Sequence, residues 1–171
     1  MHARFTPSQT VGPYWHLGLD WLARGQVVGT RGDLGIHGTV YDGAGVPVND
    51  ALLETWQADA HGRYGARHGD LPYGFGRVAT DGDGRYALRT DLPGAAAGAA
   101  PMLVVTLFMR GLLQPLLTRL YFPGLMANAV DDVLSSVPSE RRASLIATGA
   151  GTGLRWDIHL QGERETAFFE A

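Results

Sequence analysis

The sequence predicts an all-β fold, namely an antiparallel β-sandwich with one short helix and long loops. Short segments that alternate apolar and polar residues recur along the chain, as half-buried strands require. Glycine and proline, which occur 24 and 9 times in 171 residues, separate these segments with turn-forming stretches. Many short strands joined by glycine-rich turns are typical of a sandwich.

Five segments carry the strand pattern, and they are 34–41, 51–57, 85–90, 103–108 and 155–161. The first of them keeps its apolar residues on one face and is followed by turn residues at 42–45. The segment 103–108 is apolar without alternation, which predicts a strand covered on both sides. The last segment returns to strict alternation, with Trp156 and Ile158 directed inward.

One helix is predicted around residues 138–148. Pro138 lies near its start, where a missing backbone N–H is tolerated, and Leu145 and Ile146 form an apolar patch behind exposed arginines. The alanine- and glycine-rich stretch 94–100 is predicted to be a flexible loop.

Composition disfavours several classes of function. Acidic residues outnumber lysine and arginine by 17 to 14, so nucleic acid is not an expected partner. Cysteine is absent, which excludes disulfides, thiolate metal sites and cysteine nucleophiles. The longest apolar stretch, 102–109, is too short to cross a membrane, and no signal-like apolar core appears near Met1, so a cytoplasmic location is expected. The length predicts a single domain over residues 1–171.

The residue pattern alone does not predict a metal or nucleotide site. Six histidines are present, but no two have the spacing at which a single strand or helix could direct both imidazoles at one ion. The stretch 81–84 is predicted to be a turn, because Leu92 stands where a calcium loop needs its bidentate glutamate. No nucleophile elbow and no phosphate-cradling loop occurs.

Residues 40–48 and 54–64 together resemble the signature region of the intradiol ring-cleavage dioxygenases. The resemblance extends to residues 6–14, 118–122 and 155–169, which are similar to the iron-free alpha chains in the two-chain members of this family. Single-chain members carry an additional N-terminal helical segment, whereas here a short arm leads almost directly into the sandwich. The resemblance therefore implies a two-chain enzyme.

In this family a ferric ion is held by two tyrosinates and two histidines, a hard set of oxygen and imidazole donors that suits Fe(III). The resemblance places the first tyrosine at Tyr64, whereas alanines follow Pro93-Gly94 where the second is expected. The family's His-x-His pair aligns with Met102 and Val104, whose thioether and isopropyl groups cannot replace imidazole. The resemblance thus implies a vestigial site at Tyr64, Met102 and Val104, no metal in this chain, and Fe(III) bound by a homologous beta chain.

The family resemblance also assigns a role to an N-terminal arm of about residues 1–16. In the two-chain enzymes the corresponding segment crosses to the partner and lines the substrate pocket above the iron, which implies substrate contacts for Thr10, Gly12, Pro13 and Tyr14. The Tyr14 ring and hydroxyl would offer an apolar wall and a polar tip to an aromatic acid. The alternative for such an arm is a frayed terminus.

The resemblance implies a function that this chain performs only together with a beta chain. A higher alpha–beta oligomer would take protocatechuate and O2 to 3-carboxy-cis,cis-muconate in the β-ketoadipate pathway of aromatic catabolism, with no catalytic residue in this chain and no activity without the partner. The alternative is a non-enzymatic, transthyretin-like sandwich that binds a ligand or a partner.

Overall fold

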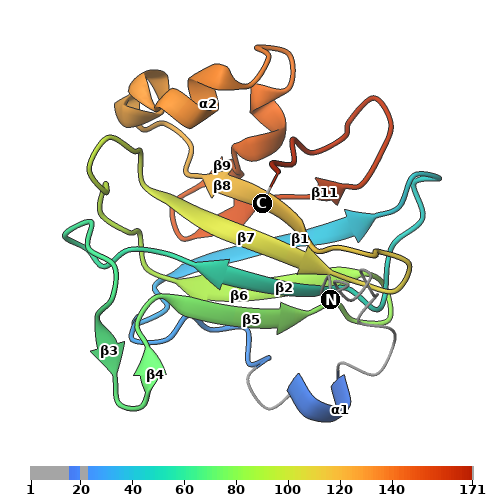
Figure 1. Cartoon of the computed structure of the whole chain (residues 1–171), viewed down its shortest axis with the longest axis horizontal. Coiled ribbons are helices and arrows are strands. Elements are labelled where there is room, and N and C mark those ends of the chain that lie inside the picture. Colours follow the sequence, from blue (N-terminus) through green and yellow to red (C-terminus); the bar gives the residue numbers. More distant parts are fainter. Residues whose placement is uncertain (1–15, 20–22, 171) are drawn as a thin grey trace, which may run out of the picture.

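The computed structural model describes residues 16–19 and 23–170, in which two β-sheets pack face to face (Figure 1). The first sheet contains β1 (Leu34–Tyr41), β6 (Arg85–Thr90), β9 (Thr148–Ala150), β10 (Gly153–Arg155) and β11 (Ile158–His159). The second sheet contains, in spatial order, β5 (Phe75–Ala79), β2 (Leu52–Trp56), β7 (Met102–Phe108) and β8 (Leu116–Tyr121). A separate hairpin is formed by β3 (Arg67–His68) and β4 (Leu71–Pro72).

The first sheet is mixed. Its strand β1 pairs antiparallel with β6 but parallel with β10 and β11, so the expected antiparallel pairing holds throughout the second sheet and only partly in the first. The strand expected at 155–161 is also interrupted. At the break, the Asp157 carboxylate accepts the Thr39 amide hydrogen at 3.0 Å, in place of a backbone carbonyl. Gly38 permits this close approach, since a Cβ there would lie 1.8 Å from the Trp156 carbonyl oxygen.

The second sheet buries one face and half-buries the other. In β7 the residues Leu103, Val105 and Leu107 are buried, whereas Met102, Val104 and their even-numbered neighbours are partly exposed. The expectation that this strand is covered on both sides is therefore wrong for the chain by itself. Its outer face remains available to carry a site.

The helical content lies mainly between β8 and β9 and differs from the prediction. The elements are α1 (His16–Leu19), η2 (Met126–Val130), α2 (Asp132–Ser136) and η3 (Arg142–Leu145), where η marks a 3-10 helix. The helix predicted at 138–148 is wrong, because only a 3-10 turn forms there. The Arg142 guanidinium binds the carbonyl oxygens of Ser135 and Val137 at 2.6 and 2.8 Å, which anchors this turn to the end of α2. None of the helices in the described residues is long and apolar enough to cross a membrane.

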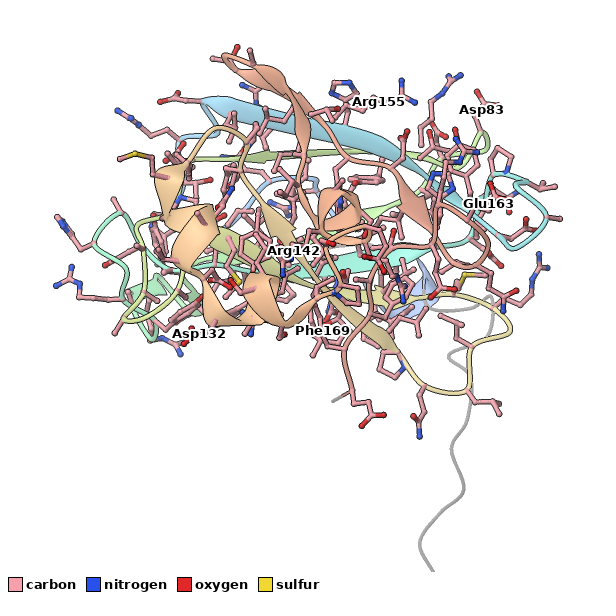
Figure 2. The ribbon with its side chains drawn as sticks, turned by 90° about the horizontal axis from the view of Figure 1, so that it is seen from above. Asp83, Asp132, Arg142, Arg155, Glu163 and Phe169 are labelled. Atoms are coloured by element: carbon pink, nitrogen blue, oxygen red, sulfur yellow. The ribbon has the colours of Figure 1, made fainter. Side chains whose placement is uncertain are left out.

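Two apolar clusters hold these layers together. The larger lies between the sheets and includes Ile36, Val40, Leu107 and Ile158. The smaller lies beneath the helical segment 126–145 and consists of the buried residues Ala100, Tyr121, Leu134, Val137, Leu145 and Ala167. In the view of Figure 2, Asp132 and Phe169 lie on the side opposite Arg155 and Asp83, so the helical segment and the C-terminus share the side of the second sheet.

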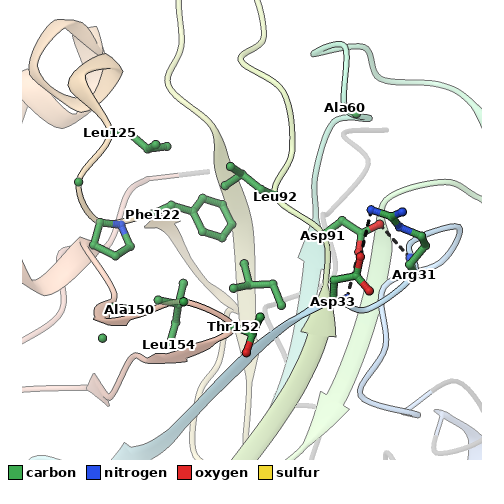
Figure 3. Close-up of a pocket in the computed structure, with 15 residues that line it drawn as sticks. Arg31, Asp33, Ala60, Asp91, Leu92, Phe122, Leu125, Ala150, Thr152 and Leu154 are labelled. Carbon is green, nitrogen blue, oxygen red and sulfur yellow. Dashed lines mark hydrogen bonds and ion pairs between the residues drawn. The ribbon is translucent and has the colours of Figure 1, made fainter.

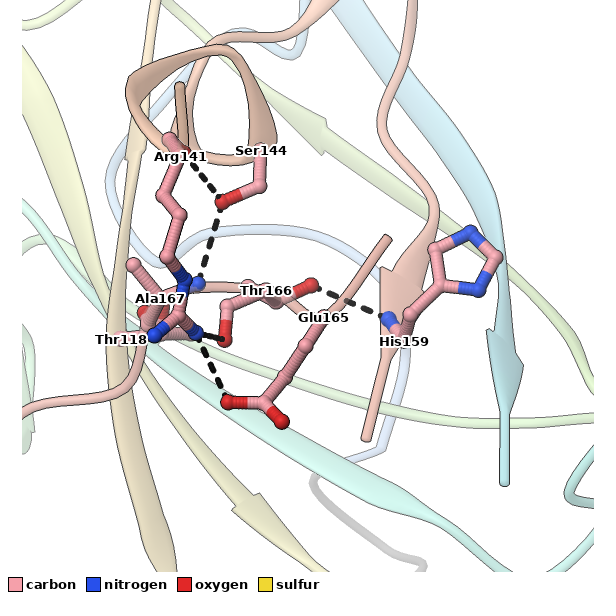
Figure 4. Close-up of polar contacts among 7 residues, drawn as sticks. All are labelled: Thr118, Arg141, Ser144, His159, Glu165, Thr166 and Ala167. Carbon is pink, nitrogen blue, oxygen red and sulfur yellow. Dashed lines mark hydrogen bonds and ion pairs between the residues drawn. The ribbon is translucent and has the colours of Figure 1, made fainter. Parts of the chain in front are cut away.

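Residues 165–169, which we call the C-terminal clasp, close the β8 edge of the second sheet (Figure 4). The Thr118 hydroxyl donates to the Ala167 carbonyl at 2.8 Å, and the Phe169 amide donates to the Leu117 carbonyl at 2.8 Å. Buried Thr166 accepts the His159 amide hydrogen at 3.0 Å, which ties the clasp to the first sheet as well. These contacts hold Phe169 beside the outer face of β8.

Candidate functional site

The loop that follows β2 is organised around Asp59. Its carboxylate accepts the backbone amides of His61 and Arg63 at 2.8 and 3.0 Å, and it also pairs with the Arg63 guanidinium. Chiefly because of the Arg63 amide, the pKa of Asp59 is lowered, so the carboxylate keeps this role near neutral pH. This turn sets the position of the next residue, Tyr64.

The loop without the second tyrosine packs directly against the Tyr64 loop. The Gly94 amide donates to the Asp59 carbonyl at 2.9 Å. Gly62 adopts a φ of +76°, and a Cβ there would lie 1.9 Å from the Ala95 carbonyl oxygen. The structure therefore brings together the two loops to which the family resemblance assigns tyrosinates, although only one of them carries the phenol.

Met102 and Val104 lie on the outer face of β7, away from the core. Val104 is paired with Trp56 on one side and with Arg119 on the other, and Met102 is paired with Tyr121. Residues directly opposite each other in an antiparallel ladder point to the same face of the sheet. Arg119 and Tyr121 thus flank the two positions that align with the family's histidines.

Tyr64 lies within electrostatic reach of the same face. Burial raises the pKa of its phenol, and the positive charge of Arg119 opposes this effect in part. The residue is 43% exposed, so it borders the outer face and does not pack into either apolar cluster.

The three positions of the expected vestigial site do not offer the donors that a ferric ion needs. Tyr64 supplies one phenol, while Met102 and Val104 supply neither nitrogen nor oxygen. Within residues 16–19 and 23–170, no cluster of three or more His, Cys, Asp or Glu side chains is placed to hold a metal. The residue paired with Val104 on β8 is Arg119, whose guanidinium would repel a metal cation.

Arg119, Tyr121 and Asp131 form a polar cluster that the sequence reasoning did not identify. The Tyr121 hydroxyl donates to the Asp131 carboxylate at 2.9 Å, and the Arg119 Nη1 lies 3.5 Å from the same hydroxyl. Asp131 is 1% exposed and also accepts the backbone amides of Ala100 and Leu134, each at 2.8 Å. Alternation in the motif 118–122 would have placed Arg119 and Tyr121 on one face, but nothing local connects them to Asp131.

A separate pocket of about 740 Å³ opens where the ends of the two sheets meet (Figure 3). Its apolar wall is formed by Leu92, Phe122, Leu125 and Leu154, and its polar rim contains Arg31, Asp33 and Asp91. The described residues that line it do not include Tyr64, Met102 or Val104.

The substrate contacts predicted for Thr10, Gly12, Pro13 and Tyr14 concern positions outside the described residues. The structure brings together Met102, Val104 and the surroundings of Tyr64, and it leaves the role of the arm as a prediction.

Comparison with known proteins agrees with the architecture. The Dioxygenase family model matches residues 19–102. The chain is 41% identical to the protocatechuate 3,4-dioxygenase alpha chain of Burkholderia cepacia over 96% of each protein, and 32% identical to the beta chain of the same species over 93% of this chain and 77% of that one. Among solved structures, a dioxygenase domain from Streptomyces sp. SirexAA-E superposes with a TM-score of 0.64 at 26% identity and covers 97% of this chain and 95% of that one. The chain therefore belongs to the intradiol dioxygenase family and, within it, to the protocatechuate 3,4-dioxygenase alpha chains.

Proposed function

We propose that this chain is the iron-free partner in an alpha–beta protocatechuate 3,4-dioxygenase. One observation supports the proposal above all: the chain is 41% identical to an alpha chain over 96% of its length. The family resemblance aligns Met102 and Val104 with metal-binding imidazoles, and neither side chain can replace them. The protein then has the fold of the enzyme without the donors for its metal. It contributes structure and substrate contacts, and the beta chain contributes Fe(III).

The proposed contribution to the substrate pocket comes from the N-terminal arm of about residues 1–16, which precedes a single sandwich domain. Gly12 and Pro13 would fix the path of the backbone, Tyr14 would provide an aromatic wall with a hydroxyl at its tip, and Thr10 would add a weaker polar contact. Fe(III), held by residues of the partner, would supply the activation of the catecholate that its cleavage by O2 between the two hydroxyl-bearing carbons requires. The residues of this chain orient the substrate and exclude water around it.

The proposed partner is a homologous beta chain, because the chain is 32% identical to a curated beta chain and the two could pair through similar folds. The complex would work in the cytoplasm, in the ring-opening step of aromatic catabolism.

Reconstitution tests the proposal. The chain, its beta chain and the mixture would each be supplied with Fe(III) and protocatechuate, and O2 uptake would be recorded together with the absorbance of the muconate product. We expect cleavage by the mixture and none by this chain alone. A stable complex with unchanged beta-chain activity, or a stable iron-free homo-oligomer isolated from the native host, would contradict the proposal and favour a binding module.

A further inference from the structure

A fixed positive charge stands on the face from which the metal ligands have been lost. Arg119 lies on β8 directly across from Val104, and Tyr121 lies directly across from Met102. All four side chains therefore share the outer face of the second sheet. The two positions that would present imidazoles to a metal face a guanidinium and a phenol instead.

Aromatic and acidic groups surround this guanidinium. The Arg119 Cζ lies 5.8 Å from the centroid of the Phe169 ring, and Nη1 is within 3.5 Å of the Tyr121 hydroxyl. Behind that hydroxyl lies the buried carboxylate of Asp131, at 2.9 Å. No carboxylate of the described residues forms an ion pair with Arg119, so its charge is balanced at longer range, by Asp131 through the Tyr121 hydroxyl.

The elements that hold Arg119 come from distant parts of the chain. The C-terminal clasp delivers Phe169 through the hydrogen bond of its amide to Leu117. Asp131 is fixed at the start of α2, where it accepts the Leu134 amide as the N-cap. A planar, permanently charged guanidinium suits these surroundings, because it can stack on an aromatic ring while it donates to oxygen.

We propose that Arg119 replaces the metal cation in this chain: its guanidinium supplies the positive charge that the vestigial site would otherwise take from iron, and it keeps metal ions out. The absence of the imidazoles and the presence of the guanidinium would then serve the same end. It follows that imidazoles returned to positions 102 and 104 would bind a metal ion more weakly while Arg119 is present than after its charge is removed. The inference concerns this chain alone and stands whether or not the proposed partnership is correct.

The test restores a minimal metal site with and without the guanidinium. The variant Met102→His/Val104→His would place two imidazoles two residues apart on one face of β7, a pair that can chelate Ni²⁺. The same pair would be made with Arg119→Gln, with Arg119→Met as a second neutral replacement in case the first fails to fold, and with Arg119→Lys, which keeps the charge. Arg85→Gln, a charge loss at an exposed position on the first sheet, is the matched control.

Ni²⁺ affinity would be measured by titration calorimetry at about pH 8, where unperturbed histidines are neutral. Each full-length variant would be used in the state in which it is purified, alone or with its partner, and the parent protein in that state would give the background. Thermal melting would confirm that each variant is folded.

We expect the neutral replacements to tighten Ni²⁺ binding by about tenfold or more over the histidine pair alone, because a single charge roughly 6 Å from a divalent ion repels it appreciably even in a high dielectric. Arg119→Lys and Arg85→Gln should not tighten it. Equal affinity with arginine and with glutamine or methionine at position 119 would overturn the inference. So would a folded neutral variant that binds Ni²⁺ no better than the parent protein, since something other than charge would then exclude the ion.

Discussion

The Tyr121 hydroxyl donates to the Asp131 carboxylate across 2.9 Å, and both residues are almost completely buried. Burial alone would raise the pKa of Asp131, but the amides of Leu134 and Ala100, the Tyr121 hydroxyl and the charge of Arg119 together lower it. Burial is also the main reason why the pKa of Tyr121 rises to about 12. The pair therefore consists of an ionised acid and a neutral phenol at all moderate pH values.

The lowered pKa of Asp131 predicts how stability depends on pH. As the pH falls, Asp131 is protonated in the unfolded chain before it is protonated in the folded chain. The carboxylate therefore contributes fully to the free energy of unfolding above about pH 4, and this contribution is lost as the pH falls further. Asp131→Asn should lower the free energy of unfolding by about 1–3 kcal/mol at neutral pH. The single oxygen of the amide cannot accept hydrogen bonds from the Tyr121 hydroxyl and from the backbone amides of Ala100 and Leu134 together. The variant should also show a shallower loss of stability between about pH 4 and pH 2.

Urea unfolding across this pH range would check the prediction, with the exposed neighbour Asp132 changed to Asn as the control. If the free energy of unfolding of Asp131→Asn changed with pH in parallel with that of the parent protein, the Asp131 carboxylate would not be the titrating group.

The break between β10 and β11 depends on the absence of a side chain at Gly38. Tyr86 donates its hydroxyl to the Trp156 carbonyl at 2.5 Å, and a Cβ on Gly38 would lie 1.8 Å from that same oxygen. Gly38→Ala should destabilise the fold by roughly 1–3 kcal/mol or more, as overpacking does. Gly35→Ala, on the same strand, places its Cβ at an ordinary 3.5 Å from its nearest neighbour and serves as the matched control. Similar melting temperatures for the two variants would show that the contact can relax freely.

The connection between β7 and β8 is the surface that we expect to need a partner. Its leucines are only partly covered, and Leu113 is 65% exposed. Leu113→Ser should reduce self-association of the free chain in sedimentation velocity and weaken its binding to the beta chain. Val46→Ser, which changes a residue that is 55% exposed on another turn, should do neither. A free chain that is monomeric before either substitution, and unchanged by added beta chain, would argue against this surface.

Tyr14 is the residue of the arm on which the proposed substrate contact chiefly depends. Tyr14→Ala should leave assembly and iron content of the complex intact, because the proposed role of the arm is to contact the substrate and not to hold the sandwich or the metal. Loss of an aromatic wall and one hydrogen bond should lower kcat/KM by roughly tenfold to a hundredfold, which corresponds to about 1–3 kcal/mol.

Steady-state O2 uptake would measure this effect, with Ser8→Ala as a control elsewhere in the arm. Unchanged kcat/KM at equal iron occupancy would remove Tyr14 from the substrate pocket.

The alternation of apolar and polar residues was sufficient to predict strands that no contact with a distant part of the chain interrupts. The expected segments 34–41 and 85–90 coincide with β1 and β6 at both ends. The break at Trp156 and Asp157 was not predictable, since it depends on the amide of Thr39, which is far away in sequence.

The predicted helix at 138–148 failed for a related reason. The Arg142 guanidinium donates hydrogen bonds to the carbonyls of Ser135 and Val137. Ile146 adopts an extended conformation and pairs with Tyr121, so the helix cannot continue to residue 148. A local signal for α2 did exist, because Asp131 stands as an N-cap before Asp132 and Leu134.

The candidate site divides in the same way. The missing donors at Met102 and Val104 could be read from the family resemblance, because they require only an alignment of residue types. The proposed role of Arg119 could not be predicted from the sequence. It depends on Phe169 and Asp131, which lie later in the chain and are brought close to Arg119 by the fold.

The most direct test of the account is the iron content of this chain, purified alone and in the alpha–beta complex, measured together with the visible absorption of tyrosinate bound to Fe(III). We predict no stoichiometric iron and no such colour in the isolated chain, and one iron for each alpha–beta pair in the complex. Tight ferric binding by the isolated chain, with the charge-transfer band, would contradict the assignment of Met102 and Val104 to a vestigial site and, with it, the central claim.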